Sequence, residues 1–308
     1  MTTTKVNVTG KDDTAVEVSV STYGAGRPVL LLHGGAGPQS MTGFAEHLSA
    51  AHRVNALVPI HPGFGGTDRP SALTGIRALA KLYSDVIDKL DLRDVTIIGN
   101  SIGGWLTAEI ALLKSPRIRD IVLVDAVGIE VPGHPVADFF NLTMDDVFRR
   151  SFHNPEPFRV DPASMPPEAQ AVAAGNRAAL AAYAGESMSD PTLAARLSSL
   201  TVPTLVLWGA SDQIVDADYG RAYALAIPTA DFTLLTETGH SPPTGDPGAG
   251  TEGAQRQGFP LARRRRLTHP PSAAGEWLCA AATAIESAYR LSSALRGGQV
   301  LGSSSPST

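Results

Sequence analysis

The strongest sign of chemistry in the chain is the segment GNSIGG at 99–104. It follows an apolar run and opens an alanine- and leucine-rich helical pattern, so we expect Ser101 at a tight turn between a strand and a helix. Gly99 and Gly103 suit such a turn, because a strained backbone and a closely packed helix leave no room for a Cβ atom. A serine hydroxyl becomes an effective nucleophile when a base takes its proton. The segment therefore predicts a nucleophilic serine with a base elsewhere in the chain.

Two later motifs supply a candidate base and a candidate acid. His240, in TGHSP, follows the last predicted strand, from where an imidazole can reach the carboxyl edge of a sheet. Asp212, in WGASD, follows the preceding strand by a short turn and should emerge at the same edge, where it could orient the histidine. Asp125, Asp216 and Asp218 are the alternative positions for this carboxylate.

A glycine-rich segment, HGGAGP at 33–38, follows another apolar run. Its small side chains let backbone amides approach a ligand, and Gly34 and Gly35 lie at its centre. The amides of Gly35 and Ile102 could converge on one oxygen, with Ile102 at the start of the helix behind Ser101. We therefore expect this segment to bind the oxyanion that develops on a carbonyl substrate.

The strands and helices that should position these residues predict an α/β fold. Short β-branched runs alternate with helical patterns, which is typical of a sheet with crossover helices. We predict strands at 5–8, 16–23, 29–32, 54–58, 95–98, 121–124, 204–208 and 232–235, and helices near 40–50, 74–91, 102–114 and 216–226. The first two strands should form an antiparallel edge. The later runs are continuously apolar, as expected for strands covered on both faces.

The chain divides into a core at 1–130 and 201–242, an insertion at 131–200, and a tail at 243–308. The insertion lacks a strand pattern and carries helical segments separated by prolines. Its place in the chain puts it over the carboxyl edge of the sheet, where open α/β proteins bind ligands, so we expect it to be a helical cap. The alternative is an embellishment remote from the site.

The tail has a different composition from the rest of the chain. It is rich in glycine and proline, carries four consecutive arginines at 263–266, and could form one amphipathic helix at 276–296. We expect it to be disordered apart from that helix. One hypothesis is that the reading frame shifted after about Pro243, which would explain the abrupt change.

Composition narrows the class of protein. The 308 residues are 43% hydrophobic and 18% charged, and no apolar stretch is long enough to span a bilayer. The polar residues 1–11 lack a secretory signal pattern, so a cytoplasmic protein is expected. A net charge of −5 argues against nucleic-acid binding, and the lone Cys279 allows no internal disulfide. No spacing of cysteines and histidines suggests a metal site.

In combination, the ordered motifs HGG, GNSIGG, GASD and TGHSP resemble those of the α/β-hydrolase superfamily over about residues 20–242. The resemblance implies a mostly parallel eight-stranded sheet with helices on both faces, a helical cap, and a triad of Ser101, Asp212 and His240. No cofactor is implied. The segment HPGFGGT at 61–67 resembles a further loop of that superfamily, with His61 where an aspartate is frequent, and we expect no catalytic role for it.

The substrate expected from this resemblance is a small to medium carbonyl compound. HGGxGP with GNSxGG is similar to hydrolases that cleave carbon–carbon bonds in ring-fission products, which commonly carry a tryptophan after the catalytic histidine. Here Ser241 stands at that position, so we expect a carboxylic ester, lactone or thioester cleaved through an acyl-enzyme. Carbon–carbon hydrolysis, perhydrolase activity and a catalytically impaired binding protein are the alternatives. The apolar segments 136–140 and 147–152 favour a partly hydrophobic substrate, and the sequence does not fix the oligomeric state.

Overall fold

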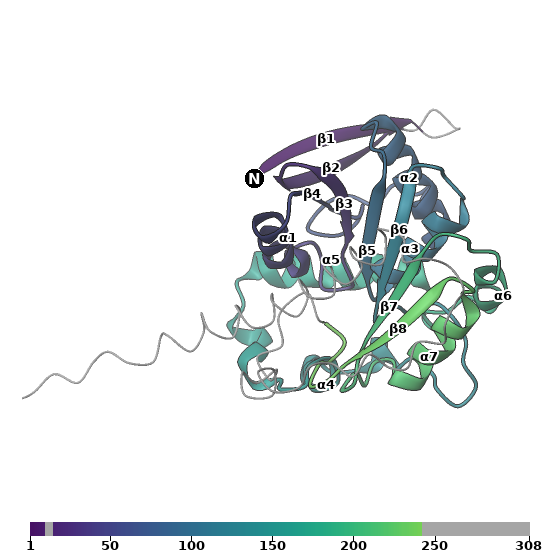
Figure 1. Ribbon diagram of the computed structural model, residues 1–308. Coiled ribbons are helices and arrows are strands. Elements are labelled where there is room, and N and C mark those ends of the chain that lie inside the picture. The colour runs from purple at the N-terminus through teal and green to yellow at the C-terminus, as the bar shows by residue number, and fades with distance from the viewer. Residues whose placement is uncertain (10–14, 242–308) are drawn as a thin grey trace, which may run out of the picture.

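Eight strands form one sheet in the order β1-β2-β4-β3-β5-β6-β7-β8. The computed structural model describes residues 1–9 and 15–241, and Figure 1 shows how the elements are arranged. The strands are β1 (Thr2–Thr9), β2 (Ala15–Gly24), β3 (Arg27–Leu32), β4 (Val54–Pro59), β5 (Val95–Asn100), β6 (Ile118–Val124), β7 (Thr204–Gly209) and β8 (Ala230–Leu235). Each of the eight predicted strands is thereby confirmed, with most of them extended by a few residues.

The sheet combines an antiparallel edge with a parallel centre. β1 pairs with β2 and β2 with β4 in antiparallel fashion, and the remaining neighbours from β4 to β8 are parallel. Burial follows this division, because side chains alternate between buried and exposed along much of β2 whereas every residue of β5 and β7 is buried. The expected antiparallel edge is confirmed, and the expected coverage on both faces holds for β5 and β7. It does not hold for β8, which is the last strand of the sheet and has one buried residue, Leu235.

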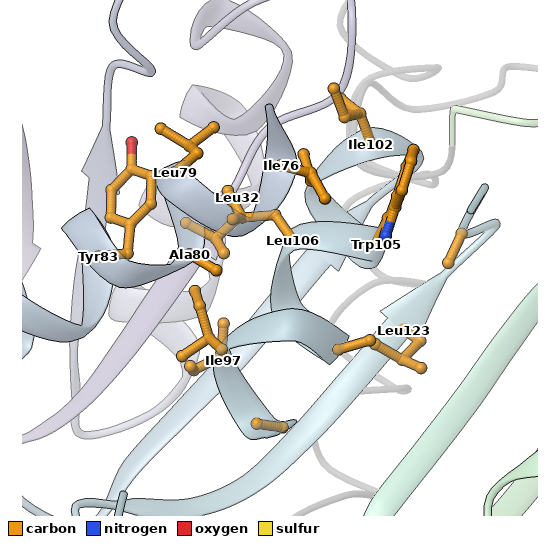
Figure 2. Close-up of a cluster of buried hydrophobic side chains, with 14 of the residues drawn as sticks. Leu32, Ile76, Leu79, Ala80, Tyr83, Ile97, Ile102, Trp105, Leu106 and Leu123 are labelled. Atoms are coloured by element: carbon orange, nitrogen blue, oxygen red, sulfur yellow. The ribbon is translucent and has the colours of Figure 1, made fainter. Parts of the chain in front are cut away.

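Helices pack on both faces of the sheet. The four predicted core helices are present as α1 (Gln39–Ala51), α2 (Ile76–Lys89), α3 (Ile102–Leu112) and α7 (Ala217–Ala226). Buried side chains of α1 join one hydrophobic cluster with alternate residues of β3, whereas α2, α3 and α7 belong to the other. Figure 2 shows part of the second cluster, in which α2 and α3 pack over the sheet; it labels Leu32, Ile76, Leu79, Ala80, Tyr83, Ile97, Ile102, Trp105, Leu106 and Leu123.

The strand order fixes where a site can form. From β3 the chain proceeds to β4 on one side and later to β5 on the other, so β3 and β5 are parallel neighbours at a topological switch point. In open α/β sheets the crevice outside the carboxyl ends of such strands is where ligands bind. The segments that follow β3 and β5, at 33–38 and 99–104, therefore meet at this point.

Residues 131–200 consist of helices and loops. They hold η1 (Phe139–Asn141), α4 (Met144–Ser151), η2 (Glu156–Phe158), η3 (Pro162–Ser164), α5 (Pro167–Ala184) and α6 (Leu193–Leu197). α5 begins with Pro167, where the missing N–H costs nothing because the first amides of a helix lack intrahelical partners. Figure 1 shows α5 crossing the end of the sheet, and its Asn176 and Tyr183 hydrogen-bond to the loops that follow β3 and β4.

The expectations for the tail, including a helix at 276–296 and the frame-shift hypothesis, lie outside the described residues. Within the described residues, no helix combines the length and apolarity needed to cross a bilayer.

Candidate active site

Ser101 occupies a sharp turn between β5 and α3. Its φ of 57° and ψ of −119° are rarely adopted by residues with a side chain, and strain of this kind gathers at functional sites. A Cβ atom at Gly99 would lie 2.1 Å from the carbonyl oxygen of Gly103, and one at Gly103 would lie 2.2 Å from that of Leu32. Both positions therefore require glycine, as the sequence pattern suggested, and the packing aims the serine side chain out of the turn.

The serine hydroxyl, an imidazole and a carboxylate form a hydrogen-bonded chain. Ser101 Oγ lies 2.9 Å from His240 Nε2, and His240 Nδ1 lies 2.8 Å from Asp212 Oδ2. The carboxylate accepts a hydrogen bond from Nδ1–H, so in the neutral ring Nε2 carries the free lone pair that can take the serine proton. Asp212 and His240 are buried, and Ser101 is half-buried. The arrangement can generate a serine nucleophile.

Backbone amides fix the carboxylate of Asp212. Its Oδ1 accepts from the N–H groups of Ile214 and Val215, at 2.7 and 3.0 Å. This leaves Oδ2 free to face the imidazole of His240. Because the two amides lie two and three residues after Asp212, the turn after β7 orients its own carboxylate.

The C-terminal end of α4 holds the loops that carry Asp212 and His240. The N–H of His240 donates to the carbonyl oxygen of Ser151 at 2.8 Å, and the N–H of Gln213 donates to that of Arg150 at 3.0 Å. From the other side, Asn100 Nδ2 donates to the carbonyl oxygen of His240 at 3.0 Å. The last carbonyls of a helix lack intrahelical donors, so α4 satisfies its own end by binding these loops.

Asp125 lies beside the site but does not contact the imidazole. Its Oδ1 accepts from the N–H of Gly209 at 2.7 Å, at the start of the turn that carries Asp212. Full burial raises the pKa of Asp125 well above its ordinary value, and the neighbouring Asp212 carboxylate raises it further. Asp125 therefore braces the turn that carries Asp212 through the Gly209 amide.

The remaining alternative acids are used elsewhere. Asp216 caps α7 by accepting from the N–H of Tyr219 at 2.9 Å, and its other oxygen lies 2.7 Å from His134 Nδ1. Asp218 pairs with Arg221 at 2.6 Å. Of the four aspartates considered from the sequence, Asp212 is the one that meets His240.

The glycine-rich loop at 33–38 lies against the nucleophile turn. A Cβ atom at Gly34 would lie 3.2 Å from the Cβ of Ser101, and one at Gly35 would lie 3.0 Å from Leu180 of α5. Among the described residues, neither the amide of Gly35 nor that of Ile102 has a protein acceptor. Both amides are thus available to a ligand oxygen next to Ser101.

Sequence reasoning missed the side chains of α5 that brace these loops. Buried Asn176 accepts from the N–H of Gly65 at 2.8 Å and donates to the carbonyl oxygen of Ala36 at 3.3 Å. Tyr183 donates to the carbonyl oxygen of Pro62 at 2.9 Å. The one available signal was a polar residue at 176 within an alanine-rich helix, and it does not reveal the partner.

Two other histidines lie in the protein interior, His33 at the start of the loop at 33–38 and His61 in the loop that follows β4. His33 and His61 stack with ring centroids 3.7 Å apart. Burial lowers the pKa of both, that of His33 to about 4, so both rings are neutral near pH 7. Within residues 1–9 and 15–241, no group of three or more histidines, cysteines or acidic residues is placed to hold a metal ion.

Comparisons with known proteins match the region that carries these residues. A family model described as the alpha/beta hydrolase family matches residues 29–254. A 2-hydroxy-6-oxononadienedioate/2-hydroxy-6-oxononatrienedioate hydrolase of Cupriavidus pinatubonensis is 26% identical over 257 residues, covering 76% of this chain and 88% of the relative. Lipase 3 of a Moraxella species is 27% identical over 231 residues, covering 70% and 72%. The structure of an esterase from Thermogutta terrifontis superimposes with a TM-score of 0.61 at 24% identity, covering 78% and 93%.

Proposed function

The chain belongs to the alpha/beta hydrolase family, and on that premise we propose that it is a serine hydrolase working through an acyl-enzyme. The observation that carries the proposal is the chain of contacts from Ser101 Oγ through His240 to Asp212, at 2.9 and 2.8 Å. We infer that the substrate is a small to medium carboxylic ester, lactone or thioester.

The first half of the proposed reaction forms the acyl-enzyme. Ser101 Oγ attacks the carbonyl carbon while Nε2 of His240 takes its proton, and Asp212 stabilises the resulting imidazolium. The negative charge moves to the carbonyl oxygen, which accepts hydrogen bonds from the amides of Gly35 and Ile102. His240 then gives its proton to the leaving group as the carbon–oxygen or carbon–sulfur bond breaks, and the acyl group stays on Ser101.

The second half regenerates the enzyme. A water molecule attacks the acyl carbon as His240 takes one of its protons, and the same two amides stabilise the second oxyanion. The bond to Ser101 Oγ breaks, the serine recovers its proton from His240, and the carboxylic acid leaves. These steps balance without a cofactor.

We further propose that residues 131–200 act as a cap that shapes the acyl pocket. A Cβ atom at Gly35 of the proposed oxyanion loop would lie 3.0 Å from Leu180, which supports a place for α5 above the reacting carbonyl. The aromatic pair Phe139 and Phe140 packs partly against the core and lies under the Arg177 guanidinium. Apolar groups of this kind favour a partly hydrophobic acyl or leaving group.

Carbon–carbon hydrolysis of a ring-fission product is the second candidate. The observation in its favour is the similarity to the Cupriavidus hydrolase, whose name specifies a 2-hydroxy-6-oxo dienedioate or trienedioate. The same serine, base and oxyanion amides would serve that reaction, with a carbon leaving group protonated in place of an oxygen. Ser241, after the histidine, is the residue that separates this chain from the usual pattern of those enzymes.

A substrate panel tests the proposal on the full chain. We expect p-nitrophenyl butyrate, a γ-lactone or a butyryl thioester to give a kcat/KM at least about tenfold above that of a 2-hydroxy-6-oxo dienoate, and p-nitrophenol to appear in a burst equal to the enzyme concentration. Ser101→Ala should abolish both signals. Preference for the dienoate would support the second candidate. Binding of these compounds by folded wild type without turnover would support the impaired binding protein.

A further inference from the structure

His33, His61 and Tyr83 form a buried cluster at the base of the loop at 33–38, of which His33 is the first residue. Their exposed fractions are 0%, 1% and 0%, and they come from the ends of β3 and β4 and from the middle of α2. Phe64 meets the His33 and His61 rings edge-on, at centroid distances of 5.1 and 5.8 Å. The proposed reaction uses none of these side chains, although the cluster lies directly behind the proposed oxyanion loop.

The hydrogen bonds of the cluster are satisfied together by one set of tautomers. The N–H of His61 donates to His33 Nε2 at 3.2 Å, so the proton of neutral His33 is on Nδ1, which donates to the carbonyl oxygen of Gly34 at 2.8 Å. His61 Nε2 lies 3.1 Å from the carbonyl oxygen of His33 and must carry a proton to bond it. His61 Nδ1 then accepts from the Tyr83 hydroxyl at 2.6 Å. All four ring nitrogens have partners.

These bonds constrain the peptide that would bind an oxyanion. The carbonyl oxygens of His33 and Gly34 each face an imidazole N–H, so two successive peptide groups of the loop are held. In a trans peptide the N–H points opposite to the C=O, so the Gly35 amide is directed away from the histidines. Gly34 lies against Ser101, which puts that amide beside the nucleophile. A free glycine loop would sample many orientations of the same peptide.

We propose that His61 and Tyr83 are positioning residues, which hold His33 and the Gly34–Gly35 peptide so that the Gly35 amide meets the developing oxyanion. The inference rests on the proposed function. It adds two residues, His61 and Tyr83, that lie outside the motifs of the triad and of the proposed oxyanion loop. Tyr83 sets the tautomer of His61, His61 binds the His33 carbonyl, and the His33 ring binds the Gly34 carbonyl. Preorganised donors accelerate acyl transfer because they need no reorientation when charge develops.

The surroundings of the cluster keep both rings neutral. Burial lowers the pKa of His61 well below its ordinary value, and the nearby His33 lowers it further. The titratable groups facing the cluster are Tyr83 from α2 and, across Phe64, Tyr183 from α5, with the Arg69 guanidinium 6.0 Å from the Tyr183 ring. A proton added to His33 Nε2 would oppose the His61 N–H, so the bonded arrangement requires neutral histidines.

Three variants test the inference on the full chain. His61→Leu removes both ring nitrogens, His61→Gln keeps a side-chain N–H that can reach the His33 carbonyl, and Tyr83→Phe removes one hydroxyl. Tyr223→Phe is the matched control. Tyr223 lies in α7, it is also buried, and its hydroxyl is 3.4 Å from the carbonyl oxygen of Val127. Active sites are counted by titration with a fluorophosphonate, so that misfolded molecules do not enter kcat.

The expected result is a fall in kcat per titrated site with little change in KM. Loss of a single oxyanion donor lowers kcat about 100- to 1000-fold, so a donor that is only misplaced should cost about 30-fold in His61→Leu and about fivefold in Tyr83→Phe. His61→Gln should recover most of the loss, and Tyr223→Phe should stay within about twofold of wild type. The affinity for a trifluoromethyl ketone, which forms a tetrahedral adduct, should fall by the same factors as kcat/KM.

Two results overturn the inference. If the folded wild type neither reacts with the fluorophosphonate nor turns over any ester, lactone or thioester, the proposed function fails and this inference fails with it. If the wild type is active and both His61→Leu and Tyr83→Phe keep its kcat per titrated site, the inference alone fails. A purely structural role would lower the number of titratable sites and leave kcat per site unchanged.

Discussion

Ser101, the proposed nucleophile, and its proposed partners Asp212 and His240 are held in place by different kinds of structure. Ser101 is fixed by residues beside it in the chain and by the adjoining strand, because Gly99, Gly103 and Leu32 approach within distances that exclude a Cβ atom. The loops of Asp212 and His240 are bound on the core side by Asp125 and Asn100, and two further backbone hydrogen bonds join them to the distant helix α4. The nucleophile turn is thus part of the protein interior, whereas the acid and base loops need a segment outside the sheet.

This difference predicts two kinds of failure. Disturbing the nucleophile turn should destabilise the whole fold, since β5 and α3 are buried over nearly their full length. Disturbing α4 should loosen His240 and Asp212 while the sheet survives. Substitutions on each side can therefore be compared by activity and by free energy of unfolding, measured on the same samples.

The largest effect is expected from Gly99→Ala. The added Cβ would lie 2.1 Å from the Gly103 carbonyl oxygen and 2.3 Å from Thr107 Oγ1, so strand and helix must separate. We expect the free energy of unfolding to fall by about 3 kcal/mol or more and activity to be lost. Urea denaturation followed by circular dichroism measures the first quantity. A variant as stable and active as wild type would show that the turn tolerates a side chain.

The second largest effect is expected from Gly239→Ala. A Cβ here would lie 2.2 Å from the carbonyl oxygen of Ser151, so it would push α4 away from the loop of His240. We expect kcat to fall about 100-fold and stability to fall by about 1–2 kcal/mol, a smaller loss of stability than in Gly99→Ala. Gly175→Ala is the control, since that helical position has no neighbour within 4 Å. Equal losses of stability in the variants at 99 and 239 would contradict the proposed difference between the turn at Ser101 and the loops held by α4.

A smaller effect is expected in the pH dependence of the free energy of unfolding, which depends on the buried histidines His33 and His61. Burial lowers the pKa of His33 from 6.5 to about 4, and that of His61 well below 6.5. Between these values the unfolded chain binds more protons than the folded one, so stability falls as pH falls from about 6.5 towards 4, by up to about 1.4 kcal/mol per pH unit for each histidine. Urea denaturation at pH 7, 6 and 5 measures this slope, and His61→Gln should make it shallower. An unchanged slope would contradict burial of a neutral His61.

The smallest effect is expected in residues 131–200, where the local stability should fall as pH rises rather than as pH falls. A hydrogen bond to Asp216 raises the pKa of His134, at the exposed contact between the segment after β6 and the start of α7. Protonated His134 therefore stabilises this contact below about pH 6.5, and the stabilisation is lost as pH rises through the raised pKa. Hydrogen exchange of residues 131–138 should quicken over that rise in wild type and much less in His134→Gln. Identical profiles would show that the pair contributes nothing.

The features held in place by local structure are also the ones that could be predicted from the sequence. The strands, the core helices and the turn at Ser101 were predictable because apolar runs, helical periodicity and close-packed glycines are local properties. The choice between Asp212 and Asp125 was not settled by sequence, since each follows a parallel strand and emerges at the same edge. The contacts that separate them are an imidazole for Asp212 and the Gly209 amide for Asp125.

The supports supplied by residues 131–200 could not be predicted. The carbonyls of Arg150 and Ser151 act through the backbone, so no residue type marks them. Asn176 is a single polar residue whose partners, Gly65 and Ala36, lie far away in the sequence. His61 lies outside this segment but is a similar case, because its partners His33 and Tyr83 are 28 and 22 residues away. Their roles depend on the packing of elements around the site, which local patterns do not specify.

Covalent labelling shows directly whether Ser101 is a nucleophile. The full chain is incubated with a fluorophosphonate, digested, and the modified residue is identified by mass spectrometry. We predict one adduct per chain, on the peptide that contains Ser101, absent in Ser101→Ala and formed far more slowly in His240→Gln. A folded wild-type chain that carries no adduct, or carries it on a different serine, would contradict the account.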